Sequence, residues 1–67
     1  MRLLINGEER ELAAGLTLAD LLADLNMKPD RVAVERNGEI VPRNQWASTI
    51  LGEHDRLEIV HFVGGGA

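Results

Sequence analysis

The stretch "TLADLLADLNM" (residues 17–27) is the segment that decides the fold. Its leucines recur at intervals of three and four residues, which is the spacing of one face of an α-helix. They are Leu18, Leu21, Leu22 and Leu25. Thr17 and Asp20 have the spacing of a capping box, so we expect the helix to begin there. Asn26 and Lys28-Pro29 are expected to end the helix, which is predicted over residues 17–27.

A strand hairpin is predicted immediately before this helix. "RLLIN" (2–6) is short and strand-like, and "EERELAA" (8–14) is its return strand. Asn6-Gly7 joins the two, and this dipeptide favours a two-residue turn because both positions tolerate positive φ. The first two strands are therefore expected to be antiparallel.

A second hairpin is predicted after the helix, in "RVAVERNGEIVPR" (31–43). Val32 and Val34 alternate with more polar neighbours, and Asn37-Gly38 is again a turn signal. Pro42 has no N–H to donate, so strand pairing should end near it or lie at a sheet edge.

The remaining residues supply one more strand. Residues 44–55 show no sustained periodicity, so we expect a short helical turn around Trp46 and then a loop. Residues 56–63 form the final strand, which most simply lies beside the first strand and parallel to it. The fold class predicted is α+β, a ββαββ β-grasp (ubiquitin-like) domain over residues 1–63. Its mixed sheet has one main helix on one face, and residues 64–67 form a flexible tail off a central strand.

The composition narrows the classes of partner. The chain has 67 residues, no cysteine, and a net charge of −4 from 11 acidic and 7 basic side chains. An acidic balance disfavours nucleic-acid binding and favours a partner protein with a basic docking surface. No apolar run approaches the roughly 18 residues of a membrane span. We expect a cytoplasmic protein without a signal peptide or membrane contact.

Catalytic and metal-binding patterns are weak. His54 and His61 are far apart in sequence and no cysteine accompanies them, so we predict no metal site. No nucleophile–base pattern and no glycine-rich loop before a helix is present. A chain of this size also offers little concave surface for a carboxylate pair. We therefore expect a protein that is not an enzyme and binds no cofactor of its own.

Several stretches together resemble one family. They are "LLING" at the start, "AAGLTLADLL" around the helix start, "IVPRNQW" (40–46), "HDRLEIVHF" before the end, and a glycine pair near the terminus. Over essentially its whole length the chain is similar to the thiamine-pathway sulfur carrier proteins, the ThiS family, and "IVPRNQW" is the most specific mark.

The resemblance implies a protein that carries sulfur. In this family a partner activating enzyme adenylates the terminal glycine carboxylate with ATP. Sulfur from a sulfur donor protein then converts it to a thiocarboxylate, which donates sulfur to thiazole synthase. Two alternatives stay open at this point. The carrier could serve another acceptor, such as molybdopterin or an amino-acid precursor, or the chain could be a β-grasp binding module that carries nothing.

The resemblance also assigns the reactive terminus. It places the family's Gly-Gly end on Gly65 and Gly66, so Gly66 is predicted to accept sulfur, with Gly64 as a further part of the tail. Glycine lacks a Cβ and can thread a narrow channel, and four residues after Val63 reach roughly 13–14 Å when extended. Ala67 departs from the family pattern: it is removed before use, or supplies the carboxylate itself, or is foreign to the natural protein.

Alternation in the last strand predicts a docking surface. Leu57 and Ile59 share one face and are assigned to the core, whereas Val60 and Phe62 share the other face. Leu4 of the neighbouring first strand is assigned outward with them. Because an uncovered apolar patch usually marks a partner site, we predict that Leu4, Val60 and Phe62 dock the partner enzymes. The alternative is that a loop or a second copy covers the patch.

Overall fold

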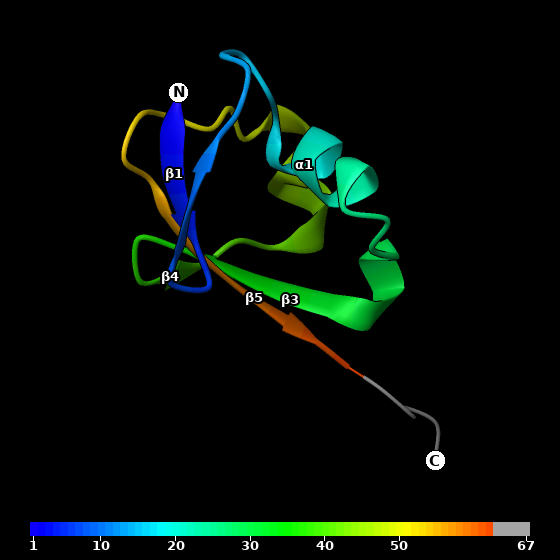
Figure 1. The fold of residues 1–67 in the computed structure, drawn as a ribbon. Coiled ribbons are helices and arrows are strands. Elements are labelled where there is room, and N and C mark those ends of the chain that lie inside the picture. The colour runs from blue at the N-terminus through cyan, green and yellow to red at the C-terminus, as the bar shows by residue number, and fades with distance from the viewer. Residues whose placement is uncertain (63–67) are drawn as a thin grey trace.

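The computed structural model describes residues 1–62. Five strands, one α-helix and two 3₁₀ helices make up this part of the chain (Figure 1). In chain order they are β1 (Arg2–Ile5), β2 (Glu8–Glu11), α1 (Leu18–Asp24), η1 (Pro29–Arg31), β3 (Val32–Arg36), β4 (Glu39–Ile40), η2 (Arg43–Ser48) and β5 (Arg56–His61).

The strands form one mixed sheet in the order β2-β1-β5-β3-β4. β1 and β5 are parallel, with Ile5 opposite Leu57, and the remaining neighbours are antiparallel. β5 therefore lies at the centre of the sheet, and its C-terminal end points away from the body of the domain (Figure 1). This arrangement confirms the predicted α+β β-grasp fold and the predicted parallel pairing.

Both predicted hairpin turns are present. Asn6 and Gly7 have φ angles of 51° and 84°, and Asn37 and Gly38 have 52° and 89°. Positive φ at both central residues matches the right-handed twist of the flanking strands, which fixes the register of each hairpin. β4, just before Pro42, is short and lies at the sheet edge, as the proline predicted.

One face of the sheet is buried against the helical layer. The core contains the helix leucines, inward residues of three strands, and two residues from the 41–55 region. It consists of Leu3, Ile5, Leu18, Leu21, Leu22, Val32, Val34, Trp46, Leu51, Leu57 and Ile59. Trp46 lies in η2, is buried, and donates from Nε1 to the Val41 carbonyl oxygen at 2.8 Å. Its side chain is therefore part of the core.

The helix is shorter than predicted. The capping box is present, since the Thr17 side chain accepts from the Asp20 N–H and the Asp20 carboxylate accepts from the Thr17 N–H. The helix ends at Asp24, however, because Asn26 has a φ of 58° in the left-handed region, which a helix cannot continue through. Leu25 is only half-buried beside the core, so the predicted leucine face loses its last member.

The predicted strand boundaries were too long. β2 ends at Glu11, and not at residue 14, because β1 has only four residues to pair with it. β5 ends at His61, and not at residue 63, although the Phe62 N–H still donates to the Arg31 carbonyl oxygen at 2.7 Å. The single turn of η1 was not anticipated from the Lys28-Pro29 pair. For β2 and β5 the neighbouring strand, and not the segment's own sequence, limits the length of the element.

Candidate functional site

The outward face of β5 exposes two large apolar side chains. Val60 is 55% exposed and Phe62 is 49% exposed, while Leu57 and Ile59 are buried. Leu4 on β1 is half-buried on the same outward face, because its neighbours Leu3 and Ile5 point into the core. The predicted facing is therefore observed at all three residues. Their role in docking stays a prediction.

A fourth apolar residue belongs to this face and was missed in the sequence. Ile40 of β4 is 65% exposed. It lies opposite Glu35, which has the outward orientation, and Ala33 lies opposite Val60 on the same face. The two-residue Asn37-Gly38 turn fixes this register, since it pairs Arg36 with Glu39 and therefore Glu35 with Ile40. The outward orientation of Glu35 would thus have placed Ile40 outward as well. The apolar surface thus extends across β5, β3 and β4.

The Asn6 side chain holds β5 beyond the end of β1. Its Nδ2 donates to the Ile59 carbonyl oxygen at 3.2 Å, and its Oδ1 accepts from the Ile59 N–H at 2.7 Å. The Asn6 side chain therefore takes the place of a further β1 residue and satisfies the backbone N–H and carbonyl oxygen of Ile59. This contact keeps the exposed end of β5 extended just before Val60 and Phe62.

Asp55 fixes the beginning of the same strand. It is the buried charged residue among those described, and its carboxylate accepts from Arg36 Nε at 2.9 Å, Asn37 Nδ2 at 3.0 Å and the Gly52 N–H at 2.7 Å. Burial raises the pKa of Asp55, but the hydrogen bonds from Gly52, Asn37 and Arg36 and the Arg36 charge outweigh burial and hold its pKa below the ordinary value. Asp55 thereby ties the loop before β5 to the β3–β4 turn.

The contacts of Asp55 could not be predicted from the sequence. The spacing of Gly52 and Asp55 is compatible with a side-chain turn, but nothing in the sequence pairs Asp55 with Arg36. That pairing depends on the antiparallel register of β3 and β5.

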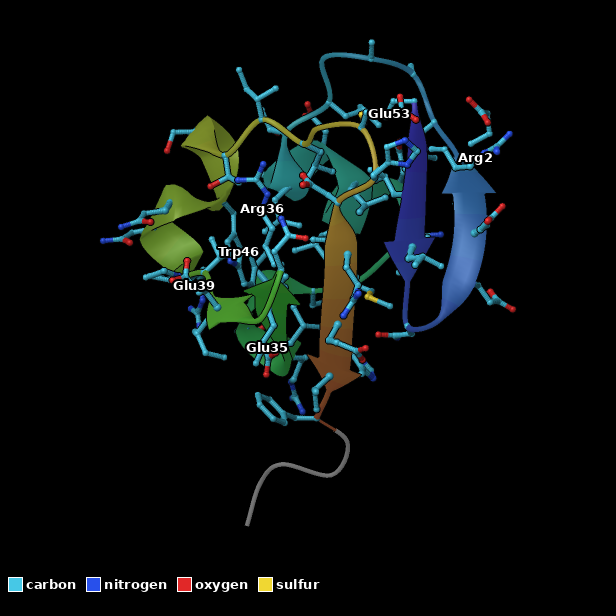
Figure 2. All side chains as sticks on the ribbon, turned by 90° about the vertical axis from the view of Figure 1, so that its left-hand side faces the viewer. Arg2, Glu35, Arg36, Glu39, Trp46 and Glu53 are labelled. Carbon is cyan, nitrogen blue, oxygen red and sulfur yellow. The ribbon has the colours of Figure 1, made fainter. Side chains whose placement is uncertain are left out.

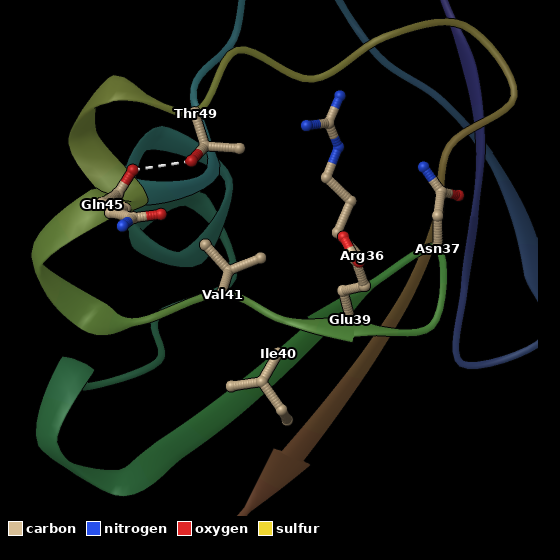
Figure 3. Close-up of a pocket in the computed structure, with 7 residues that line it drawn as sticks. All are labelled: Arg36, Asn37, Glu39, Ile40, Val41, Gln45 and Thr49. Atoms are coloured by element: carbon tan, nitrogen blue, oxygen red, sulfur yellow. Dashed lines mark hydrogen bonds between the residues drawn. The ribbon is translucent and has the colours of Figure 1, made fainter.

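A polar hollow of about 240 Å³ lies between the β3–β4 hairpin and η2 (Figure 3). Its lining is Arg36, Asn37, Glu39, Ile40, Val41, Gln45 and Thr49. Arg36 is the cationic residue of this lining and is already paired with Asp55. The Thr49 hydroxyl donates to the Gln45 carbonyl oxygen at 2.7 Å. The Arg36, Asn37 and Thr49 side chains already bond within the chain, so we assign no ligand to the hollow.

Within residues 1–62, no three His, Asp or Glu side chains are grouped as metal ligands, and no helix has the length and apolar character to cross a membrane. The predicted tail, including Gly64, Gly65, Gly66 and Ala67, lies outside the described residues. The candidate site is therefore the outward sheet face that leads to this terminus.

A β-grasp domain with an exposed apolar sheet face beside its C-terminal strand is the architecture expected of ubiquitin-like carriers. A model of the ThiS family matches residues 3–66. The sulfur carrier protein ThiS of Escherichia coli is 35% identical over 66 residues, which is 98% of this chain and 100% of that protein. This chain therefore belongs to the ThiS family.

Two further comparisons agree with this membership. The crystal structure of the thiamine biosynthesis protein ThiS from Geobacter metallireducens superimposes with a TM-score of 0.84 at 33% identity, covering 98% of this chain and 100% of that one. A thiazole synthase of Paramagnetospirillum magneticum is 49% identical over 67 residues, but this chain spans only 21% of its length. The chain thus corresponds to about a fifth of the thiazole synthases that it matches.

Proposed function

We propose that this chain is the sulfur carrier of thiamine biosynthesis and delivers the sulfur atom of the thiazole ring. The observation that carries this proposal is the family match over residues 3–66, because it includes both the β-grasp domain and the glycine terminus. The resemblance of the chain to part of two thiazole synthases supports thiazole synthase as the acceptor enzyme. No described feature favours molybdopterin or an amino-acid precursor as acceptor.

The chemistry requires an activated carboxylate. A carboxylate resists nucleophilic attack until one oxygen becomes part of a good leaving group. In the proposed first step a carboxylate oxygen attacks the α-phosphorus of ATP on the activating enzyme, which forms the acyl-adenylate and releases pyrophosphate. Hydrosulfide, supplied in the cell through a sulfur donor protein, then attacks the carbonyl carbon and AMP leaves. The product is the thiocarboxylate.

In this scheme the chain is a substrate of partner enzymes and not itself a catalyst. ATP is consumed by the activating enzyme, and the carrier binds no cofactor. Because the activation consumes ATP, we expect the carrier to act in the cytoplasm. The carrier's contribution is to bring a narrow terminus into another protein's active site, which glycines allow because they lack a Cβ.

We propose Gly66 as the sulfur-accepting residue, with Gly64 and Gly65 as the approach to it. The family match ends at residue 66, which supports removal of Ala67 before activation. Mass analysis of the mature protein from its own cells tests this assignment. A thiocarboxylated form that still carries Ala67 would show that alanine is the acceptor.

Docking is proposed to involve Leu4, Val60 and Phe62. Val60 lies near the end of β5 and Phe62 directly follows it, so a partner bound there receives the tail directly. Leu4 lies on the same face of β1, opposite Arg56 at the beginning of β5. The activating enzyme and thiazole synthase need the same terminus in turn. We therefore expect the two enzymes to compete for the carrier in a binding assay.

One experiment tests the proposed function as a whole. The purified chain, prepared so that it ends at Gly66, is incubated with ATP, a sulfide source and the activating enzyme, and its intact mass is measured. We expect an increase equal to the difference between a sulfur and an oxygen atom, dependent on ATP. An unchanged mass with an activating enzyme that modifies its own cognate carrier would overturn the proposal.

A further inference from the structure

We propose that the activating enzyme binds this sheet face with an arginine side chain placed between Glu35 of β3 and Glu58 of β5. This inference rests on the proposed function and specifies the chemistry of the partner. It starts from a pair of carboxylates that the fold itself leaves uncompensated.

Glu35 and Glu58 are directly opposite each other in the antiparallel β3–β5 pair. Residues in this relation have Cβ atoms about 5 Å apart, and like charges there destabilise the sheet. Neither carboxylate forms an ion pair with any of the residues 1–62. Arg56 lies two residues before Glu58 on the same strand but is not within ion-pairing distance of either. The folded chain thus carries a repulsive pair without a countercharge.

The other half of the same face is arranged differently. Glu9 and Glu11 of β2 also point outward, but the Nε atom of Arg2 on β1 lies 4.0 Å from Glu9 Oε1 and 3.5 Å from Glu11 Oε1. Figure 2 shows the sheet from the side away from α1, with Arg2 on one side of β5 and Glu35 on the other. The chain therefore neutralises its acidic side chains over β1 and β2 and leaves those over β3 and β5 available.

The surroundings of the uncompensated pair favour an arginine. Ile40 lies beside Glu35, and Val60 is the next outward residue after Glu58 on β5. Both apolar side chains are more than half exposed, at 65% and 55%. A partner that covers them also removes water from the two carboxylates, which strengthens a charge-assisted hydrogen bond. The planar guanidinium can bond both carboxylates and is less strongly hydrated than the lysine ammonium group.

The occupant of this face must come from another protein. Residues 63–67 contain no basic side chain, so the chain's own terminus cannot neutralise the pair. A second copy would bring the same two glutamates and a net charge of −4 to the interface. Charge complementarity therefore favours a basic partner surface, and the activating enzyme is the first protein that must hold this terminus.

The test uses the full chain with Glu35→Gln, Glu58→Gln and both together, and measures affinity for the purified activating enzyme by calorimetry at low and high salt. We expect each single variant to bind about tenfold more weakly at low salt, with a much smaller difference at high salt. Thermal stability should stay equal or rise, because the repulsion between the two carboxylates is removed. Glu39→Gln is the matched control, since Glu39 is exposed on β4 but lies opposite Arg36 in the β3–β4 register, on the other face of the sheet.

The outcomes separate this inference from the proposed function. One outcome would overturn only the arginine-docking inference. In that outcome the wild-type chain gains sulfur, but the double variant binds the activating enzyme as tightly as the wild type does. An effect of Glu39→Gln equal to that of Glu35→Gln would overturn it as well, because the loss would then reflect net charge alone. A chain ending at Gly66 that neither binds the activating enzyme nor gains sulfur would overturn both.

Discussion

Neighbouring residues of β5 differ sharply in their surroundings. Leu57 has no exposed surface and Ile59 is 6% exposed, whereas Val60 and Phe62 are about half exposed. All four are apolar, so hydrophobicity does not explain the difference. The helical layer covers one face of the sheet and leaves the other open. One strand therefore serves both as the centre of the core and as the proposed docking surface, and changes on its two faces should have separable effects.

The largest expected effect is on the inward face. Leu57→Ala should lower the free energy of unfolding by about 3–4 kcal/mol, because a leucine buried among Leu3, Leu18 and other core residues leaves a cavity. Urea unfolding followed by circular dichroism measures this loss. Val60→Ala, on the outward face, should cost less than about 0.5 kcal/mol. Equal losses in both variants would show that the two faces are not distinct.

The next largest effect concerns the beginning of β5. Asp55→Asn should lower the free energy of unfolding by about 2–3 kcal/mol at neutral pH, since the charge that Arg36, Asn37 and Gly52 bond is lost. The exposed Asp30→Asn is the control and should change stability little. Urea unfolding at a series of pH values gives both results.

The pH dependence of the Asp55 contribution has a definite sign. The folded-state pKa of Asp55 lies below that of an unfolded chain, so its stabilisation is fully present above the ordinary aspartate pKa of about 3.9. It declines as pH falls below that value and is lost once pH passes below the folded-state pKa. The gap in stability between wild type and Asp55→Asn should therefore narrow on acidification. A gap that is constant down to pH 2 would contradict the role assigned to the carboxylate.

Phe62 tests the outward face. Phe62→Asp should leave the free energy of unfolding within about 0.5 kcal/mol of wild type but weaken binding to both partner enzymes by about 2 kcal/mol. Phe62→Leu keeps an apolar side chain and should retain most of the affinity. Calorimetric titration with each enzyme measures the effect. A folded Phe62→Asp variant that accepts sulfur at the normal rate would place the docking surface elsewhere.

The smallest expected effect concerns the Asn6 contact with β5. Asn6→Gly preserves the positive φ of the turn while removing two hydrogen bonds to Ile59, so it should cost about 1 kcal/mol. Hydrogen exchange of the Ile59 amide should become faster, whereas the Leu57 amide should keep its protection. Asn37→Gly, at the same position of the other hairpin, removes hydrogen bonds to Asp55 and Arg56 instead, so it should leave exchange at the Ile59 amide unchanged. Unchanged exchange at Ile59 would show that Asn6 does not hold the strand.

Much of this fold could be predicted from local patterns. The two Asn-Gly turns, the Thr17–Asp20 capping box and the period-two alternation of the last strand are each decided within a few residues, because backbone sterics and side-chain direction depend on near neighbours. The alternation also predicted correctly which side chains of β5 are exposed. The sequence by itself thus determined the class of fold, the outward orientation of Leu4, Val60 and Phe62 and, by resemblance, the family.

Tertiary structure alone decided the contacts between distant segments. Asp55 meets Arg36, Asn6 meets Ile59, and Glu35 meets Glu58 only because β5 is inserted between β1 and β3. The lengths of β2 and β5 were also decided there, since each strand ends where its paired neighbour ends. Interactions of this kind depend on chain segments up to 53 residues apart, and short-range preferences carry no information about such pairings.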